Sequence, residues 1–174
     1  LMAMNRQHTR EEYLKLVENI FEIIPDCSIS HDMISGFPNE SDQDHNDTLS
    51  LMEKVKYSFG YMFKYSERPG TLAAKKLEDN IDEETKSRRL SEIVELQQKH
   101  SLYRSKEFVG KTVEVLIEKE SKKSNLHWAG RNQQNTTVVF PKENYNIGDF
   151  VNVKINSCTS ATLIGEAIAF SKNN

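Results

Sequence analysis

The chain has 174 residues, which is enough for one ordinary domain or two small ones. Hydrophobic residues make up 37% of it and charged residues 28%, a balance typical of soluble globular proteins and not of disordered ones. A net charge of −3 argues against a general binder of polyanions, and no apolar run approaches the roughly 20 residues that cross a bilayer. Because the N-terminal stretch has no apolar signal-peptide core, we expect a cytoplasmic protein with no membrane partner.

The first half of the sequence alternates between helix and strand patterns. A capping box at residues 9–12 starts a predicted helix that ends near residue 24. Residues 28–37 and 59–63 have strand patterns, and a second predicted helix starts at Ser41 between them. This order predicts a parallel sheet with crossover helices. Since two parallel strands cannot form a stable α/β domain alone, we expect the last part of a larger domain whose beginning is absent.

The second half has a different pattern. After a loop, residues 82–106 predict a long helix with one apolar stripe. From Val109 onward, short stretches of alternating apolar and polar residues predict five short strands, and these favour a small closed barrel. We therefore place a boundary near residue 107, with one domain at residues 1–106 and a second at residues 107–174.

Two corners follow the predicted strands of the first half. The first corner is Gly36-Phe37-Pro38, and the second is the stretch from Tyr65 to Thr71, which includes Ser66 and Arg68. Ligands of parallel α/β sheets bind beyond the carboxyl ends of strands, and free amides at the start of the next helix could hold a carboxylate or hydroxyl. The alternative interpretation is two structural turns.

Basic residues recur along the predicted barrel, where the net charge is slightly positive, unlike that of the first half. Five of them are interleaved with His127, Trp128 and Phe140, a combination that suits single-stranded or looped RNA. An ordinary solvated surface is the alternative. The five are Lys111, Lys122, Lys123, Arg131 and Lys154.

Metal and nucleophile patterns are weak in this sequence. Cys27 and Cys158 belong to no Cys/His cluster, so no metal site is predicted. Ser30-His31-Asp32 is not a catalytic triad, because neighbours on a strand point to opposite faces. The other histidines have no partner at metal-ligand spacing, and we predict that they lie on the surface or in packing positions.

Five stretches, in this order, resemble the radical S-adenosylmethionine (SAM) methylthiotransferases over nearly the whole chain. They are MNRQHTREEY (4–13), DMISGFPNES (32–41), YSERPGT (65–71), ELQQ (95–98) and VGKTVEVL (109–116). The first stretch, together with Arg68 and Pro69, is most similar to the tRNA-modifying (MiaB-type) branch. Residues from about 107 resemble its RNA-binding TRAM domain, with GRN (130–132) and VVFP (138–141) in the expected places.

The resemblance implies an α/β fold, namely the C-terminal part of a radical SAM partial (β/α) barrel followed by a small all-β, OB-like TRAM barrel. It implies transfer of a methylthio group to isopentenyladenosine beside the tRNA anticodon. That chemistry uses SAM and two 4Fe-4S clusters, one of which cleaves SAM to a 5′-deoxyadenosyl radical. The cysteines that bind the clusters are expected upstream of Leu1, so neither Cys27 nor Cys158 is assigned as a ligand. This chain alone is therefore expected to be inactive. We expect the full-length enzyme to be a monomer.

The resemblance also implies which residues support the chemistry. It assigns no catalytic residue and no metal ligand to this chain. Asn39 and Ser41 replace the usual Gly and Thr of the family motif, which puts the turn geometry in doubt more than the function. A methylthiotransferase acting on a ribosomal-protein aspartate and a non-catalytic RNA-binding module are the alternatives. The implied SAM contacts are Gly36, Phe37, Pro38, Tyr65, Ser66 and Arg68, and the implied RNA contacts are Lys111, Lys122, Lys123, Arg131, Asn132 and Lys154.

Overall fold

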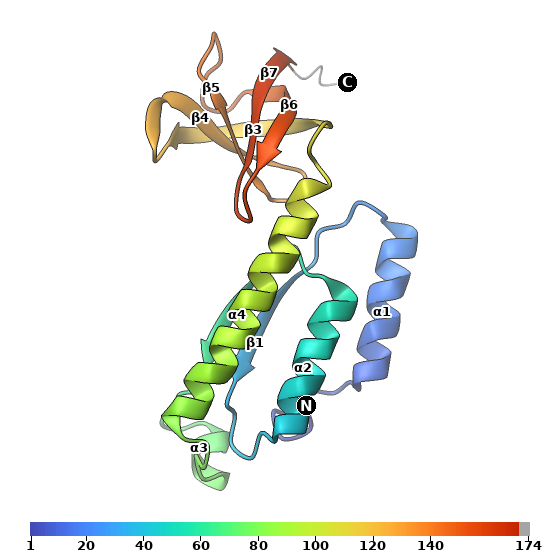
Figure 1. Cartoon of the computed structure of the whole chain (residues 1–174), viewed down its shortest axis with the longest axis vertical. Helices are drawn as coiled ribbons and strands as arrows, with labels where there is room; N and C mark the ends of the chain where they lie inside the picture. The colour runs from blue at the N-terminus through green and yellow to red at the C-terminus, as the bar shows by residue number, and fades with distance from the viewer. Residues whose placement is uncertain (171–174) are drawn as a thin grey trace. The chain divides into compact units, whose positions relative to one another are not determined.

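The computed structural model describes residues 1–170, and the chain divides into two compact units. The first unit covers residues 1–98 and the second starts at residue 99, so this division into units lies within helix α4 (Glu83–Lys106). Figure 1 shows the helices and strands of each unit.

The first unit has the predicted order of helix, strand, helix and strand. These elements are α1 (Arg10–Ile23), β1 (Ser30–Ser35), α2 (Asp42–Val55) and β2 (Phe59–Lys64). The capping box predicted at the start of α1 is present, and α2 starts at Ser41 as predicted, also with a capping box. The prediction of a parallel sheet is confirmed, with Ser30 opposite Phe59 and Ser35 opposite Lys64. Strand β1 is shorter than predicted, because Gly36 has a φ of +74° and leaves the extended conformation.

Three helices cover one face of this sheet (Figure 1). Side chains of α1, α2 and α4 meet Met33 and Met62, which lie opposite each other on β1 and β2. Burial of this apolar surface is the main contribution to the stability of the unit. Its buried residues are Val17, Met52, Val55, Tyr57 and Ile93.

The other face of the sheet is exposed. Ile34, Tyr61 and Phe63 keep 45%, 63% and 55% of their surface accessible, and Asp32 lies among them. Parallel strands are normally covered on both faces. An exposed apolar face of this kind is therefore unusual for parallel strands.

The loop after the second corner contains a short helix that the sequence did not predict. Helix α3 (Leu72–Lys76) starts at Thr71, whose hydroxyl accepts a hydrogen bond from the Ala74 amide. Helix α4 then begins as predicted, and the Asp82 carboxylate accepts a hydrogen bond from the Thr85 amide at 2.8 Å.

The second unit is the predicted small barrel, closed in the order β3-β4-β5-β7-β6. Pairing is antiparallel except between β5 and β7, which are parallel. Buried apolar residues of β3, β5, β6 and β7 fill the interior, and Phe140 and Val153 are completely buried. The strands are β3 (Thr112–Ser121), β4 (Ser124–Asn132), β5 (Thr137–Pro141), β6 (Phe150–Cys158) and β7 (Leu163–Phe170).

Within residues 1–170, no helix has the length and apolar character needed to span a membrane.

Candidate functional site

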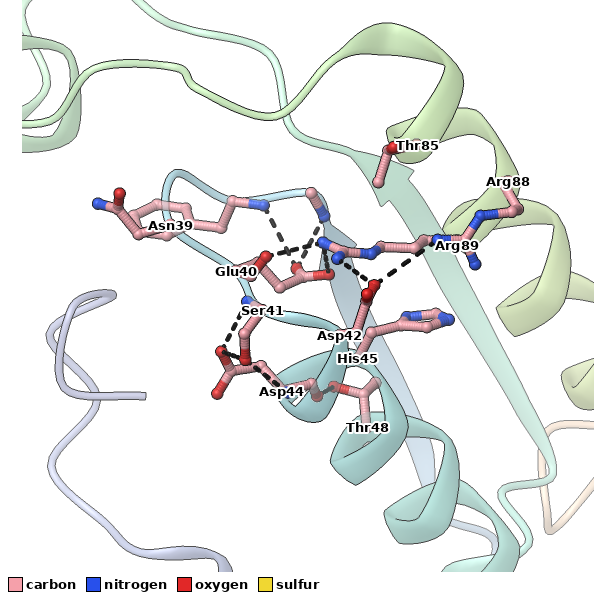
Figure 2. Close-up of polar contacts among 12 residues, drawn as sticks. Asn39, Glu40, Ser41, Asp42, Asp44, His45, Thr48, Thr85, Arg88 and Arg89 are labelled. Carbon is pink, nitrogen blue, oxygen red and sulfur yellow. Dashed lines mark hydrogen bonds and ion pairs between the residues drawn. The ribbon is translucent and has the colours of Figure 1, made fainter.

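The first corner is held by a carboxylate of its own chain. The Gly36 and Phe37 amides both donate hydrogen bonds to Oε2 of Glu40, at 2.8 and 3.4 Å (Figure 2). The corner is thus fixed by side-chain hydrogen bonds and is not a loose turn. These two amides are already satisfied, so they are not free to bind a ligand.

The sequence predicted that free amides at the start of α2 could hold a ligand. This prediction is wrong for the two amides of the capping box, which are hydrogen-bonded within the chain. The Ser41 amide donates to Oδ2 of Asp44 at 2.8 Å, and the Asp44 amide donates to the Ser41 hydroxyl at 3.1 Å. Hydrogen bonds from the hydroxyl and amide of Ser41 keep the pKa of Asp44 below its ordinary value. The capping box therefore uses the amides of Ser41 and Asp44.

Arg89 on α4 connects the first corner to the long helix. Its Nη1 donates to the Glu40 carbonyl and to Oε1 of Glu40, both at 3.0 Å, and its Nη2 donates to Oδ1 of Asp42 at 2.8 Å (Figure 2). Only 4% of the Arg89 side chain is exposed. Its hydrogen bond and charge lower the pKa of Asp42. A buried guanidinium thus orients the carboxylate that holds Gly36 and Phe37.

The second corner touches the first through its first residue. The Tyr65 amide donates to the Ser35 carbonyl at 2.7 Å, and the rings of Phe37 and Tyr65 meet edge to face with centroids 5.2 Å apart. Pro38 is buried beside them in the first corner. The structure therefore places Gly36, Phe37, Pro38 and Tyr65 together.

Ser66 and Arg68 lie differently, in the exposed part of the second corner. The Arg68 carbonyl accepts hydrogen bonds from the amide and hydroxyl of Thr71, which closes the turn before α3. In the part of the chain that the structure describes, the Arg68 guanidinium has neither an ion-pair nor a hydrogen-bond partner. It is therefore available for an external anion.

Lys86 belongs to this site, although no sequence pattern points to it. Its side chain is 3% exposed, and its Nζ lies 2.6 Å from Asp79 and 3.3 Å from Glu83. Burial lowers the Lys86 pKa, but the hydrogen bonds to Asp79 and Glu83 outweigh burial and the pKa is raised. The Nζ also lies 5.7 Å from the centre of the Tyr65 ring. A lysine on a highly charged helix is expected to be solvated, so only the fold could show its burial.

Two histidines of the first unit serve packing and hydrogen bonding. His31 Nε2 lies 2.8 Å from Oε1 of Gln97, and His45 Nε2 lies 2.6 Å from Oε2 of Glu92. The His45 hydrogen bond is the main cause that lowers the Glu92 pKa. Residues 1–170 contain no group of three or more His, Cys, Asp or Glu side chains that could hold a metal ion.

The predicted RNA contacts are spread over the barrel. Lys111 and Lys154 lie at one end of β3, because Thr112 pairs with Lys154. Lys122 and Lys123 are exposed in the turn at the other end, about 30 Å away for a ten-residue strand. The Lys154 ammonium donates to the Gly110 carbonyl.

Arg131 lies on β4 between these two ends, and Asn132 follows it. Arg131 is exposed, with its Nη1 2.7 Å from Oδ1 of Asn135 and its Nε 3.4 Å from Glu118. Asn132 is buried at 6% exposure and its Oδ1 accepts from the Thr136 amide at 2.8 Å. Asn132 thus shapes the loop after β4, and Asn135 of that loop contacts Arg131.

Two aromatic residues of the barrel do not offer the free ring faces that the sequence suggested. Phe140 is completely buried in the core. Trp128 is partly buried, and the Lys142 ammonium lies 4.4 Å from the centre of its ring. Lys142 itself was not predicted, and an isolated lysine after a strand carries no signal for such a contact.

We expect the first unit to lose stability in acid before the barrel does. Five carboxyl groups with lowered pKa lie between residues 42 and 92. Because these carboxyl groups have lower pKa values in the folded state than in the unfolded state, they stabilise the folded unit at pH values above their ordinary pKa of about 3.8 to 4.5. This stabilisation is lost as the pH falls through the lower pKa values of the folded state. The five groups are Asp42, Asp44, Asp82, Glu83 and Glu92.

Two optical signals separate the units in this acid titration. All helices of the described residues lie between residues 10 and 106, so circular dichroism at 222 nm follows the helices. Trp128, the single tryptophan, lies in the barrel, so fluorescence follows the barrel. The circular dichroism midpoint should fall at the higher pH. Coincident midpoints, or the reverse order, would contradict this expectation.

Comparison with known proteins finds relatives that match both units. A family model described as the TRAM domain matches residues 106–168. A protein of Christiangramia forsetii named tRNA-2-methylthio-N(6)-dimethylallyladenosine synthase is 69% identical over 174 residues, which is 100% of this chain and 36% of that protein. Proteins with the same name from Flavobacterium johnsoniae (67% identical; 100% of this chain and 36% of that protein) and Bacteroides fragilis (51% identical; 97% and 37%) also match.

The match extends across the boundary between the two units, and the chain spans just over a third of the length of these relatives. Identity of this level over all residues means a shared fold and a common origin. Along its whole length the chain is therefore similar to one segment of these synthases, and its residues 106–168 match the TRAM domain.

Proposed function

We propose that the full-length protein containing this segment transfers a methylthio group to carbon 2 of N6-dimethylallyladenosine in tRNA. The observation that carries this proposal is the 69% identity, over all 174 residues, to a protein named for that reaction. The acceptor is the base beside the anticodon, the enzyme acts as a monomer, and the reaction takes place in the cytoplasm.

For the first domain, residues 1–106, we propose the end of a radical SAM partial (β/α) barrel. The two parallel strands and their crossover helix support this assignment. The bare sheet face also supports it, because the exposed side chains of Ile34, Tyr61 and Phe63 need a cover in the complete protein. In this arrangement the bare face points to the inside of the barrel.

The corners fit one wall of a SAM site. Phe37 and Tyr65 offer aromatic edges suited to the adenosyl end, and Arg68 offers a free cation suited to a carboxylate. Gly36 and Pro38 shape the backbone, and Ser66 adds an exposed hydroxyl. When bound, SAM supplies the methyl group and starts the radical chemistry. The role of these residues is to bind and orient it.

The described residues do not fit an iron–sulfur cluster. Cys27 and Cys158 lie in different units, and no group of metal-binding side chains surrounds either one. No step of the proposal is therefore assigned to a cluster ligand of this segment.

For the second domain, residues 107–174, we propose binding to the tRNA anticodon loop. Lys111, Lys122, Lys123 and Arg131 are exposed and can neutralise phosphates. Lys154, next to Lys111, can share in this contact if its ammonium leaves the Gly110 carbonyl. Asn132 acts by shaping the loop after β4, whose Asn135 contacts Arg131.

Removing two of these cations should weaken tRNA binding. In the full-length protein, Lys111→Ala with Arg131→Ala is expected to lower tRNA affinity and to reduce the slope of log K against log salt by about one for each phosphate that is no longer neutralised. Fluorescence anisotropy with labelled tRNA at several salt concentrations measures both quantities. Lys15→Ala on α1, which removes an exposed lysine from the first unit, is the control. An unchanged slope in the double variant would remove these two residues from the RNA surface.

The transfer itself is tested with the reconstituted full-length protein, SAM, a one-electron reductant and a sulfide source. In parallel reactions the acceptor is either tRNA that carries N6-dimethylallyladenosine or ribosomal protein. Nucleoside mass spectrometry should detect the 2-methylthio product. If the methylthio group appears instead on an aspartate of a ribosomal protein, or if tRNA binds and no product forms, the proposed acceptor is wrong.

A further inference from the structure

Two basic side chains of α4 are buried where the helix passes the two corners. Lys86 and Arg89 are only 2% and 3% exposed, although such residues are rarely buried without a specific partner. They are three positions apart and therefore lie on the same face of the helix. Neither is assigned a role by the resemblance of the chain to its family. Their partners define what they do.

Arg89 acts on the first corner through Glu40. One carboxylate oxygen of Glu40 accepts the Gly36 and Phe37 amides, and the other accepts the Arg89 guanidinium at 3.0 Å (Figure 2). The same guanidinium also holds the Glu40 carbonyl. Carboxylate, backbone and corner are therefore fixed to α4 by one side chain.

Lys86 connects the first corner with the second. Its methylene stem packs directly on Gly36, because a Cβ built at Gly36 would lie 2.4 Å from Cγ of Lys86. Its ammonium is held by Asp79 and Glu83 and lies 5.7 Å from the Tyr65 ring centre. A shift of this side chain would therefore move Gly36 and Tyr65 relative to each other.

We propose that Lys86 and Arg89 are positioning residues that fix the two corners in the shape that binds the adenosyl end of SAM. The inference rests on the proposed function. Both cations are turned inward to protein partners, so they act through Glu40, Gly36 and Tyr65 and do not contact the ligand. Apolar residues could fill the same space at a smaller desolvation cost, but they would not orient the carboxylate of Glu40.

The test uses the reconstituted full-length protein and the dissociation constant of SAM, measured by equilibrium dialysis well below the melting temperature. Arg89→Met should raise this constant about tenfold and speed hydrogen exchange of the Gly36 and Phe37 amides. Adding Glu40→Gln should restore part of the SAM affinity, because it removes the unpaired charge and leaves an oxygen for the Gly36 amide. Arg88→Met is the matched control, since Arg88 is the adjacent arginine and is half exposed. It should change the constant less than twofold.

Lys86→Met gives an independent test if Arg89→Met does not fold. It keeps the stem against Gly36 and removes the ammonium, and it should raise the dissociation constant of SAM at least threefold while tRNA affinity stays unchanged. If the wild type binds SAM and each of these variants that folds binds it equally well, the inference is wrong and the proposed function stands. A wild type that binds tRNA but no SAM would overturn the proposed function and the inference together.

Discussion

Replacing Gly36 by alanine is expected to reduce the free energy of unfolding of the first unit by about 2–5 kcal/mol. The positive φ of +74° costs a residue with a Cβ roughly 1–2 kcal/mol. The added methyl group would also lie 2.4 Å from Cγ and 3.2 Å from Cβ of Lys86, and such overpacking costs about 1–3 kcal/mol. Urea unfolding followed by circular dichroism at 222 nm measures the change.

Gly70 provides the matched control for this substitution. Its φ of +87° imposes a similar backbone strain, but a Cβ at Gly70 would meet no atom within 4 Å. Gly70→Ala should therefore cost only about 1–2 kcal/mol. In addition, Gly36→Ala should be less harmful when combined with Lys86→Ala, which makes room for the methyl group. Equal losses for the two single variants would show that Lys86 does not pack on Gly36.

Arg68→Ala in the full-length protein is expected to lower turnover by roughly tenfold to a hundredfold, the range of one hydrogen bond to a charged group. The Arg68 side chain is exposed and has no partner in residues 1–170, so the melting temperature should not change. Turnover is measured as methylthio product per minute at saturating tRNA, together with the KM for SAM.

Lys75→Ala is the control for the loss of a cation near the second corner, because Lys75 is exposed on α3. It should leave turnover within twofold of wild type. If Arg68→Ala keeps wild-type turnover, the Arg68 side chain has no part in the reaction. Arg68 then contributes only to the turn that ends at Thr71.

Features determined by neighbouring residues could be predicted from the sequence. The capping boxes at Thr9 and Ser41 depend on residues three positions apart, and both are present. Alternating apolar residues predicted the barrel strands, because one face of each strand must fill the interior. The parallel pairing of β1 and β2 followed from the order of helices and strands.

Features determined by interactions between distant segments could not be predicted. Lys86 and Arg89 have the same local pattern as solvated residues of a charged helix, and their burial depends on Gly36, Glu40 and Tyr65, which lie more than twenty residues away. The hydrogen bonds of the first corner could not be predicted either, because no sequence pattern shows that the Glu40 carboxylate accepts from the Gly36 amide.

The proposed methylthio transfer can be measured in cells, in the tRNA nucleosides of a bacterium that lacks its own synthase gene and carries the full-length gene containing this segment. Mass spectrometry of digested tRNA should detect 2-methylthio-N6-dimethylallyladenosine, and its amount should fall when the gene encodes Arg68→Ala. Accumulation of N6-dimethylallyladenosine without any methylthio product, in cells that contain the folded wild-type protein, would contradict the proposed transfer.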